Sequence, residues 1–432
     1  MRTKTLTLTL AAVAATATLV ATPVFAEEVT NISFYTTQSG TDEQFKAVIA
    51  EFEKQNPDIK VEYLGYDSSE LQKWMSLYAS NDAPTVALID PINISSNKER
   101  MAVFDPAKEV FLENVDPGAL ATYTYDGNVY GVPISVQGYG ILYNKTAIET
   151  ATGEEFDPSQ IKTRADLRAL YEKIAASDSG IAPAMFTGAD WSLGSHFLGL
   201  AFSGCRGDST AQTEYVEKIK AGEIDFKSDE YWNALMDTFD LIKEFNYNAA
   251  DPIVGNVDID AQAFATGKAA TWFNGDWSWV QIKDVEGRGE EFGILPVFMS
   301  DDPEDPLNQI IPTSAPKAYC VDASQNDEAQ VAAGKRFVEF ITMDPFAQEQ
   351  IGQALGATLP YKNTDFVADS PLAASTAAYV AEGKTLDIYG VNLLLPSDFW
   401  LENGVPMLQY LSDVIDRDAA ADMVQEYWMS QK

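Results

Sequence analysis

The sequence predicts an α/β protein with a large buried core and two or three domains, and three observations support this. Strand patterns and helix patterns alternate from Asn31 to Ile89. Hydrophobic residues make up 46% of the 432 residues, which is enough to bury a large core and excludes a disordered chain. At roughly 150 residues per domain, the length suggests two or three domains.

The alternation begins with a predicted strand at residues 31–35, followed by the polar loop 36–41. A helix comes next, because apolar side chains recur at the i, i+3, i+4 and i+7 positions, namely Phe45, Val48, Ile49 and Phe52. A strand at 59–63, a helix at 69–79 and a strand at 85–89 complete a βαβαβ pattern. This order predicts a parallel sheet flanked by helices, with ligands expected at the carboxyl ends of its strands.

Residues 1–26 have the pattern of a secretory signal peptide: two early basic residues, an uncharged run and the small residues before Glu27. No cysteine follows the expected cleavage site to carry a lipid. No later stretch approaches the roughly 20 apolar residues of a membrane helix. We therefore expect a soluble protein, periplasmic or otherwise exported, without a lipid anchor.

The chain is strongly acidic, with 65 Asp and Glu against 29 Lys and Arg and a net charge of −36. Such a surface repels nucleic acid and anionic lipid, so neither is an expected partner. A solubilising coat on an exported protein is the favoured explanation, and adaptation to a saline habitat is a weaker one. The charge does not identify a ligand.

A single histidine, His196, leaves no histidine-rich metal site, and no metal or other cofactor is expected. Its setting, SHFLGLAF, predicts a helix face packed in the core.

The stretch from Phe264 to Trp279, FATGKAATWFNGDWSW, combines three tryptophans with a turn and a carboxylate. Tryptophan has a flat apolar face and one N–H donor, which suits it to lie against a ring-shaped ligand such as a sugar. For any one of the three, packing in the core is the more common role. Asn274, Gly275 and Asp276 resemble a turn, so Trp277 is expected where a strand ends and a loop opens.

Several motifs resemble those of extracellular solute-binding proteins of sugar-type ABC importers, the family of the maltose- and oligosaccharide-binding proteins. They occur in the family's order along nearly the whole chain after residue 26. They are Tyr130-Gly-Val-Pro133, Gly140-Ile-Leu-Tyr143-Asn144-Lys145, Ile161-Lys162-Thr163 with Asp166-Leu167, Phe264–Ala270, Asn274–Trp279, Ala329–Ile341 and the tryptophan loop Pro396–Trp400. The specificity lies in their order and spacing, since each motif alone is weak.

The resemblance implies a two-lobe α/β periplasmic-binding-protein fold, with a hinge that the chain crosses three times and a ligand cleft between the lobes. Crossings are expected near 136–139, 294–297 and 342–345. Lobe one then holds 27–136 and 298–342, and lobe two holds 139–293 and 345–432. Cys205 and Cys320 fall in different lobes on this assignment, so we expect them to stay unpaired.

The resemblance also implies candidate ligand-binding residues. Trp277 and Trp400 match tryptophans that stack on sugar in maltose-type members. Gln137 stands where those members have a glutamate, which puts maltose itself in doubt as the ligand. Asp190 and Trp191 lie where the second lobe reaches into the cleft. In the first lobe, Gln38 and Asp90 are candidates by strand-end position, although a helix-capping role is at least as well supported for either.

The function implied is that of a monomeric, non-enzymatic binding component, which captures a neutral di- or oligosaccharide and delivers it to ABC permease subunits. Two alternatives remain open. A polyamine-binding protein would need several carboxylates in the cleft, which this acidic chain could supply. A secreted carbohydrate-active enzyme would need a pair of carboxylates, but the sequence has no Gly-x-Ser-x-Gly elbow, His-Glu-x-x-His motif or phosphate loop.

Overall fold

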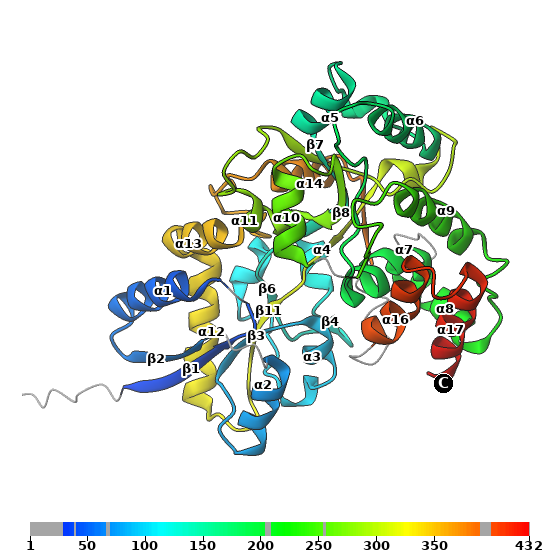
Figure 1. Cartoon of the computed structure of the whole chain (residues 1–432). Helices are drawn as coiled ribbons and strands as arrows, with labels where there is room; N and C mark the ends of the chain where they lie inside the picture. Colours follow the sequence, from blue (N-terminus) through cyan, green and yellow to red (C-terminus); the bar gives the residue numbers. More distant parts are fainter. Residues whose placement is uncertain are drawn as a thin grey trace, which may run out of the picture.

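A computed structural model describes residues 29–38, 40–65, 70–203, 209–253, 256–388 and 399–431. The expected signal peptide and Cys205 lie outside these residues. The described chain forms two lobes, each built around a β-sheet with helices packed on it (Figure 1). The α/β class and the two-lobe architecture predicted from the sequence are confirmed.

The first lobe begins with the predicted βαβαβ unit. Its elements up to the hinge are β1 (Thr30–Thr36), α1 (Asp42–Gln55), β2 (Ile59–Gly65), α2 (Glu70–Ala79), β3 (Val86–Ile89), α3 (Pro91–Ser95), α4 (Pro117–Ala121), β4 (Thr124–Tyr125), β5 (Asn128–Val129) and β6 (Val132–Pro133). The sheet has the order β2-β1-β3-β11-β6, in which β1 is parallel to both β2 and β3. The apolar face of α1 is buried against this sheet, as its spacing predicts.

Later segments of the chain return to the first lobe. They are β11 (Ala318–Val321), which runs antiparallel to β3 and β6, and the helices α12 (Glu328–Met343) and α13 (Pro345–Leu355). Figure 1 shows α13 beside α1. The side chains of Ala347, Ile351 and Leu355 are buried in the same core as β1 and β2. The Tyr361 hydroxyl donates to the Pro133 carbonyl at 2.8 Å.

The second lobe contains the remaining elements. They are β7 (Gln137–Asn144), α5 (Lys145–Thr152), α6 (Arg164–Ala175), a π-helix (Trp191–Phe197), α7 (Leu198–Phe202), α8 (Ser209–Ala221), α9 (Glu230–Glu244), α10 (Val257–Ala265), β8 (Thr271–Gly275), α11 (Trp279–Ile282), β9 (Phe292–Leu295), β10 (Ile311–Ser314), α14 (Pro371–Ala381), β12 (Thr385–Asp387), α16 (Phe399–Leu411) and α17 (Arg417–Ser430). The sheet has the order β12-β10-β7-β8, and β9 also pairs with β7.

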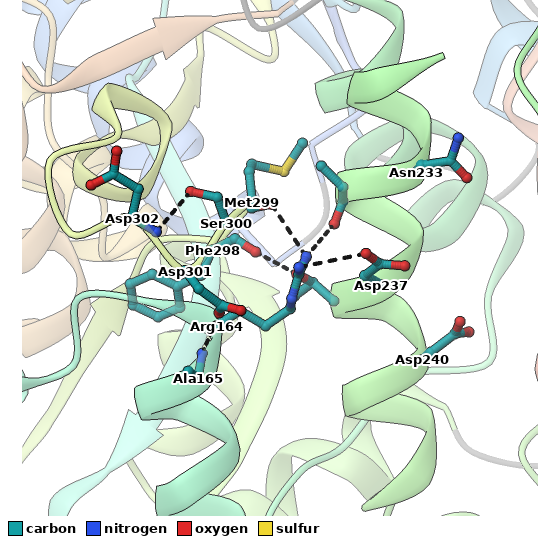
Figure 2. Close-up of polar contacts among 12 residues, drawn as sticks. Arg164, Ala165, Asn233, Asp237, Asp240, Phe298, Met299, Ser300, Asp301 and Asp302 are labelled. Carbon is teal, nitrogen blue, oxygen red and sulfur yellow. Dashed lines mark hydrogen bonds and ion pairs between the residues drawn. The ribbon is translucent and has the colours of Figure 1, made fainter. Parts of the chain in front are cut away.

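Residues 298–302 pack on the second lobe, although the resemblance to the family implied that they belong to the first. Figure 2 shows the Arg164 guanidinium between α9 and this segment. It donates to the carbonyls of Ala234 at 3.0 Å and Met299 at 3.2 Å, and it pairs with Asp237 at 3.5 Å. Asp301 accepts a hydrogen bond from the backbone N–H of Ala165 at 2.8 Å. The segment is therefore tied to α6 and α9.

These contacts differ from the lobe boundaries expected from the sequence. Residues 298–314 pack with the second lobe and residues 345–361 with the first, so the crossings expected near 294–297 and 342–345 fall inside single lobes. The reason is that an apolar strand or helix pattern does not specify which of two sheets will cover it. We propose crossings at 134–136, 315–317 and 362–369.

Cys320 lies in β11, buried, and its thiol donates to the Ala87 carbonyl at 3.5 Å. Burial raises the pKa of this thiol to about 12, so it stays protonated and unreactive at neutral pH. Its lack of a disulfide partner remains a prediction, because Cys205 lies outside the described residues. The mass of the unreduced protein will decide it.

None of the helices in the described ranges is long and apolar enough to cross a membrane.

Candidate functional site

Strand β7 separates two environments in the second lobe, because successive residues of a strand point to opposite faces. On one face, a β-carbon built on Gly138 would lie 2.6 Å from the Thr376 hydroxyl of α14. On the other face, the Tyr139 ring meets a group of aromatic rings. Gln137 shares the face of Tyr139, so the half-buried amide points to the aromatic side.

We call the four rings Tyr139, Trp191, His196 and Trp277 the aromatic cluster. The Trp277 ring centre lies 5.1 Å from that of His196, 6.0 Å from that of Tyr139 and 6.4 Å from that of Trp191. Tyr139 is buried, whereas the other three are half-buried. Three half-buried rings packed around a buried one offer an apolar surface to a ring-shaped ligand.

The backbone at the end of β8 explains why Trp277 stands at this edge. Gly275 is the last residue of β8, and a short 3₁₀ helix follows at Asp276–Ser278. A β-carbon on Gly275 would lie 2.1 Å from the Trp277 ring, so only glycine lets the ring fold back over the strand end. Trp272 and Trp279 are buried in the core, so the three tryptophans of this stretch have different roles.

Asp276 is completely buried beside Trp277 and joins three segments. One carboxylate oxygen accepts from the Gly138 N–H at 3.0 Å and from the Thr376 hydroxyl at 2.8 Å. The other oxygen, Oδ1, has no hydrogen-bond partner among the described residues. Burial raises the pKa of this carboxyl to about 7, although these hydrogen bonds favour the charged form. The residue thus holds the start of β7, α14 and the turn before Trp277 together.

His196 lies at the edge of the core rather than fully inside it: its Nδ1 atom is buried, but part of the side chain is exposed. It lies half-buried in the π-helix, with its ring 4.8 Å from the Tyr139 ring and 5.3 Å from the Trp191 ring. Its removal from water lowers the pKa to about 4, so the imidazole is neutral at physiological pH. A neutral ring contributes apolar surface to the aromatic cluster rather than charge.

Two glycines bring the π-helix against α16. A β-carbon on Gly194 would lie 2.2 Å from the Trp400 carbonyl oxygen, and one on Gly404 would lie 2.5 Å from the α-carbon of Asp190. Trp400 lies in the first turn of α16, whereas the family resemblance implied a loop, and residues 396–398 of that motif lie outside the described residues. Its half-buried ring lies 5.8 Å from that of Phe399. Asp190 accepts from the Trp191 N–H at 2.7 Å.

A second group of polar residues lies at the carboxyl ends of β1 and β3 in the first lobe. The Lys317 ammonium donates to the Thr37 hydroxyl at 2.9 Å and to the Asp90 carboxylate at 3.0 Å. Asp90 occupies the N-cap position of α3 but makes no side-chain capping bond. Gln38 follows Thr37, and its carbonyl accepts from the hydroxyl of Thr41, which occupies the N-cap position of α1. We call Thr37, Asp90 and Lys317 the strand-end group.

All seven residues selected from the sequence are half-buried, and the structure divides them among three places. Trp277 and Trp191 are in the aromatic cluster, with Gln137 on the same strand face. Asp190 and Trp400 lie where the π-helix meets α16, and Gln38 and Asp90 lie at the strand ends of the first lobe. Sequence reasoning missed Tyr139, His196 and Lys317. The period of two along β7 could have identified Tyr139, whereas the partners of Lys317 are remote in sequence.

In the ranges that the structure describes, no three His, Cys, Asp or Glu side chains are grouped so that they could hold a metal ion.

Comparison with known proteins places these features in a family. The curated relatives include an uncharacterised ABC transporter extracellular-binding protein of Pyrococcus horikoshii, 25% identical over 280 residues, and the multiple sugar-binding protein of Streptococcus mutans, 27% identical over 278 residues. These alignments cover 63% and 61% of this chain, and the chain spans 61% of the length of each relative.

A solved structure, the SBP RafE of Streptococcus pneumoniae in complex with raffinose, is similar with a TM-score of 0.72 and 19% identity. The match covers 94% of this chain and all of RafE, and at this identity it shows the shared fold. The model of the family of bacterial extracellular solute-binding proteins matches residues 36–345, which is more than half of the chain. The chain therefore belongs to the family of bacterial extracellular solute-binding proteins.

Proposed function

We propose that this protein is the substrate-binding component of an ABC transporter and captures a neutral di- or oligosaccharide between its two lobes. The observation that carries the proposal is the aromatic cluster, which presents the half-buried Trp277 and Trp191 beside the hinge. Flat aromatic faces cover the C–H patches of sugar rings and exclude water from them. The names of RafE, bound to raffinose, and of the multiple sugar-binding protein support a saccharide ligand.

The positions of the two groups support binding by lobe closure. The aromatic cluster belongs to the second lobe, whereas Thr37 and Asp90 of the strand-end group follow strands of the first lobe. Lys317, which bonds to both, lies on the segment between β10 and β11. A ligand held by both groups binds the closed form better than the open one, and it therefore shifts the population toward closure. Membrane permease subunits would distinguish the closed form from the open form. We propose that the exported monomer delivers its sugar to these subunits without chemical change.

The polar residues around these groups favour a neutral ligand over a polyamine. Of the site carboxylates, Asp90 pairs with Lys317, and Asp190 caps the π-helix. A polyamine would need several unpaired carboxylates in one place. Polyamine binding would also weaken steeply as ionic strength rises, because salt screens charge attraction, whereas stacking and hydroxyl contacts are short-ranged.

A thermal-shift screen tests the proposal. The panel contains raffinose, stachyose, maltotriose, chitotriose and spermidine, each at low and high salt. A ligand that binds only the native state stabilises it by about 2.7 kcal/mol at a hundredfold excess over Kd. We expect one or more saccharides to raise the melting temperature at both salt concentrations and to be recovered unchanged. A shift with spermidine alone that high salt abolishes, or hydrolysis of the saccharide, would refute the proposal.

A further inference from the structure

The strand-end group contains a lysine in an unusual place, at a crossing between the lobes. Lys317 lies between β10, which belongs to the sheet of the second lobe, and β11, which belongs to that of the first. Its carbonyl accepts from the Ile134 N–H at 3.0 Å, so two crossing segments run side by side here. Its side chain is 16% exposed. The ammonium is thus fixed at the hinge, on the side of the first-lobe strand ends.

The partners of Lys317 are the residues that follow two neighbouring parallel strands. Thr37 follows β1 and Asp90 follows β3, and in open α/β sheets ligands bind outside these carboxyl ends. The ammonium has three hydrogens, and the bonds to Thr37 and Asp90 use two of them. Asp90 contributes one oxygen, Oδ1, to Lys317. Within the part of the chain that the structure describes, the pair therefore keeps one donor and one acceptor for a ligand.

The behaviour of Asp90 indicates more than helix capping. An aspartate at an N-cap position before proline ordinarily accepts a bond from the first turn of the helix, as Asp116 does from Ala119 at 2.9 Å. Asp90 stands in the same setting, before Pro91, yet its side chain makes no such bond and turns to Lys317 instead. Asp90 thus has the residue type and the position of a helix cap, but its carboxylate bonds to Lys317 instead.

A second ion pair in the same lobe shows what a purely structural pair looks like. Lys335 pairs with Glu109 at 2.9 Å and donates to the Val103 carbonyl at 2.6 Å. The other oxygen of Glu109 accepts from the Asp105 N–H at 2.5 Å. Both carboxylate oxygens of that pair are thus committed within the protein, and the two side chains are similarly shielded, with 19% and 15% exposed. This pair connects α12 to a loop and does not lie at the strand ends.

We propose that Lys317 contacts the ligand and, together with Asp90, recognises two neighbouring hydroxyl groups of a neutral saccharide. The Asp90 carboxylate accepts a hydrogen bond from one hydroxyl, and the Lys317 ammonium donates to the oxygen of the next. This inference rests on the proposed function and specifies the ligand further. A carboxylated sugar would meet Asp90, and a polyamine would meet Lys317, so the pair selects against both kinds of charge.

The experiment compares Lys317→Met with Lys335→Met as the matched control. The probe is the saccharide of the panel that gives the wild type its largest thermal shift, and its Kd is measured by calorimetry. We expect Lys317→Met to lose about tenfold or more in affinity, since a buried polar partner of the ligand disappears. Lys335→Met should bind like the wild type, even where it melts at a lower temperature.

A second variant separates ligand contact from support of the loop. Asp90→Asn leaves the Lys317 charge without its carboxylate, so it should weaken binding of the neutral probe and strengthen binding of digalacturonic acid. If the pair only supported the loop, Asp90→Asn would not weaken binding of the neutral sugar and at the same time strengthen binding of the acidic one. Equal affinity of Lys317→Met and the wild type for the probe would overturn the inference while leaving the proposed function intact. Failure of the wild type to bind any saccharide would overturn both.

Discussion

The ring of Trp277 lies directly over the α-carbon of Gly275, and a β-carbon there would be 2.1 Å from ring atom Cζ3. This contact sets the position of the ring, because the strand end beneath it leaves no room for a side chain. Real β-carbons do not approach ring atoms so closely, so any other residue at position 275 must displace the tryptophan.

Gly275→Ala should therefore displace the Trp277 ring and weaken saccharide binding by about tenfold or more. Calorimetry with the panel saccharide measures the affinity, and the shift of tryptophan fluorescence reports the displaced ring. The control is the same substitution in a Trp277→Ala background. In that background the new β-carbon meets no ring, so Gly275→Ala should cause no further loss of saccharide affinity. A loss of equal size in both backgrounds would show that Gly275 acts on the strand itself.

Trp272→Ala should reduce stability and Trp277→Ala should reduce saccharide affinity, although the two residues are only five positions apart. Trp272 is fully buried and donates to the Thr187 hydroxyl at 3.0 Å, so its truncation should cost ~3–5 kcal/mol of stability. Trp277 is half-buried at the edge of the aromatic cluster. Its truncation should leave the melting temperature of the ligand-free protein nearly unchanged and reduce saccharide affinity by about tenfold or more.

Denaturant unfolding and calorimetry on the two variants separate these effects. If the Trp277→Ala protein instead melted at a much lower temperature and, where still folded, bound saccharide normally, that result would show that Trp277 packs in the core and does not bind the ligand.

Local patterns in the sequence were sufficient to predict the start of the first lobe. The apolar spacing of α1 and the strands β1, β2 and β3 agree with the expected ranges to within a few residues, because each pattern depends on neighbours along the chain. The turn before Trp277 was also found locally. In contrast, the pairing of Lys317 with Asp90 joins residues 227 positions apart, and no periodicity indicates it.

The lobe boundaries and the position of Trp400 show a second limit of prediction from the sequence. An amphipathic helix such as α13 must bury its apolar face, but its sequence does not say which lobe will cover it. The π-helix at Trp191–Phe197 has a pitch that ordinary helical spacing does not describe, and its contact with α16 depends on two glycines in separate elements. Both features become visible only when distant segments are brought together.

Arg164→Met tests the assignment of residues 298–302 to the second lobe. The guanidinium links the Met299 carbonyl to the Ala234 carbonyl and Asp237, so its loss leaves these acceptors without their donor (Figure 2). The expected cost is about 1–3 kcal/mol in the free energy of unfolding. Amide hydrogen exchange should accelerate near residues 299–302 and at the start of α6, while saccharide affinity stays unchanged. Faster exchange confined to β1–β3 would contradict the assignment.

Asp276→Asn should change how stability depends on pH. Burial raises the pKa of Asp276 to about 7 in the folded protein, from an ordinary value of 3.8. The folded state therefore holds the proton more tightly than the unfolded state, and this stabilisation is fully present below about pH 4. It is lost progressively as the pH rises toward 7, where the buried carboxyl ionises. Asparagine does not ionise, and its carbonyl oxygen can still accept from Gly138 and Thr376.

The free energy of unfolding, measured by denaturant titration between about pH 4 and pH 8, should consequently fall more for the wild type than for Asp276→Asn. The stability of the variant relative to the wild type should thus increase with pH and level off above about pH 7. Thr376→Val provides the control, because it removes a hydrogen bond that favours the charged form and should extend the decline in stability to higher pH. Parallel stability curves for the wild type and Asp276→Asn would mean that the carboxyl does not titrate in this range. Asp276 would then serve only as a hydrogen-bond acceptor that holds β7 and α14 beside Trp277.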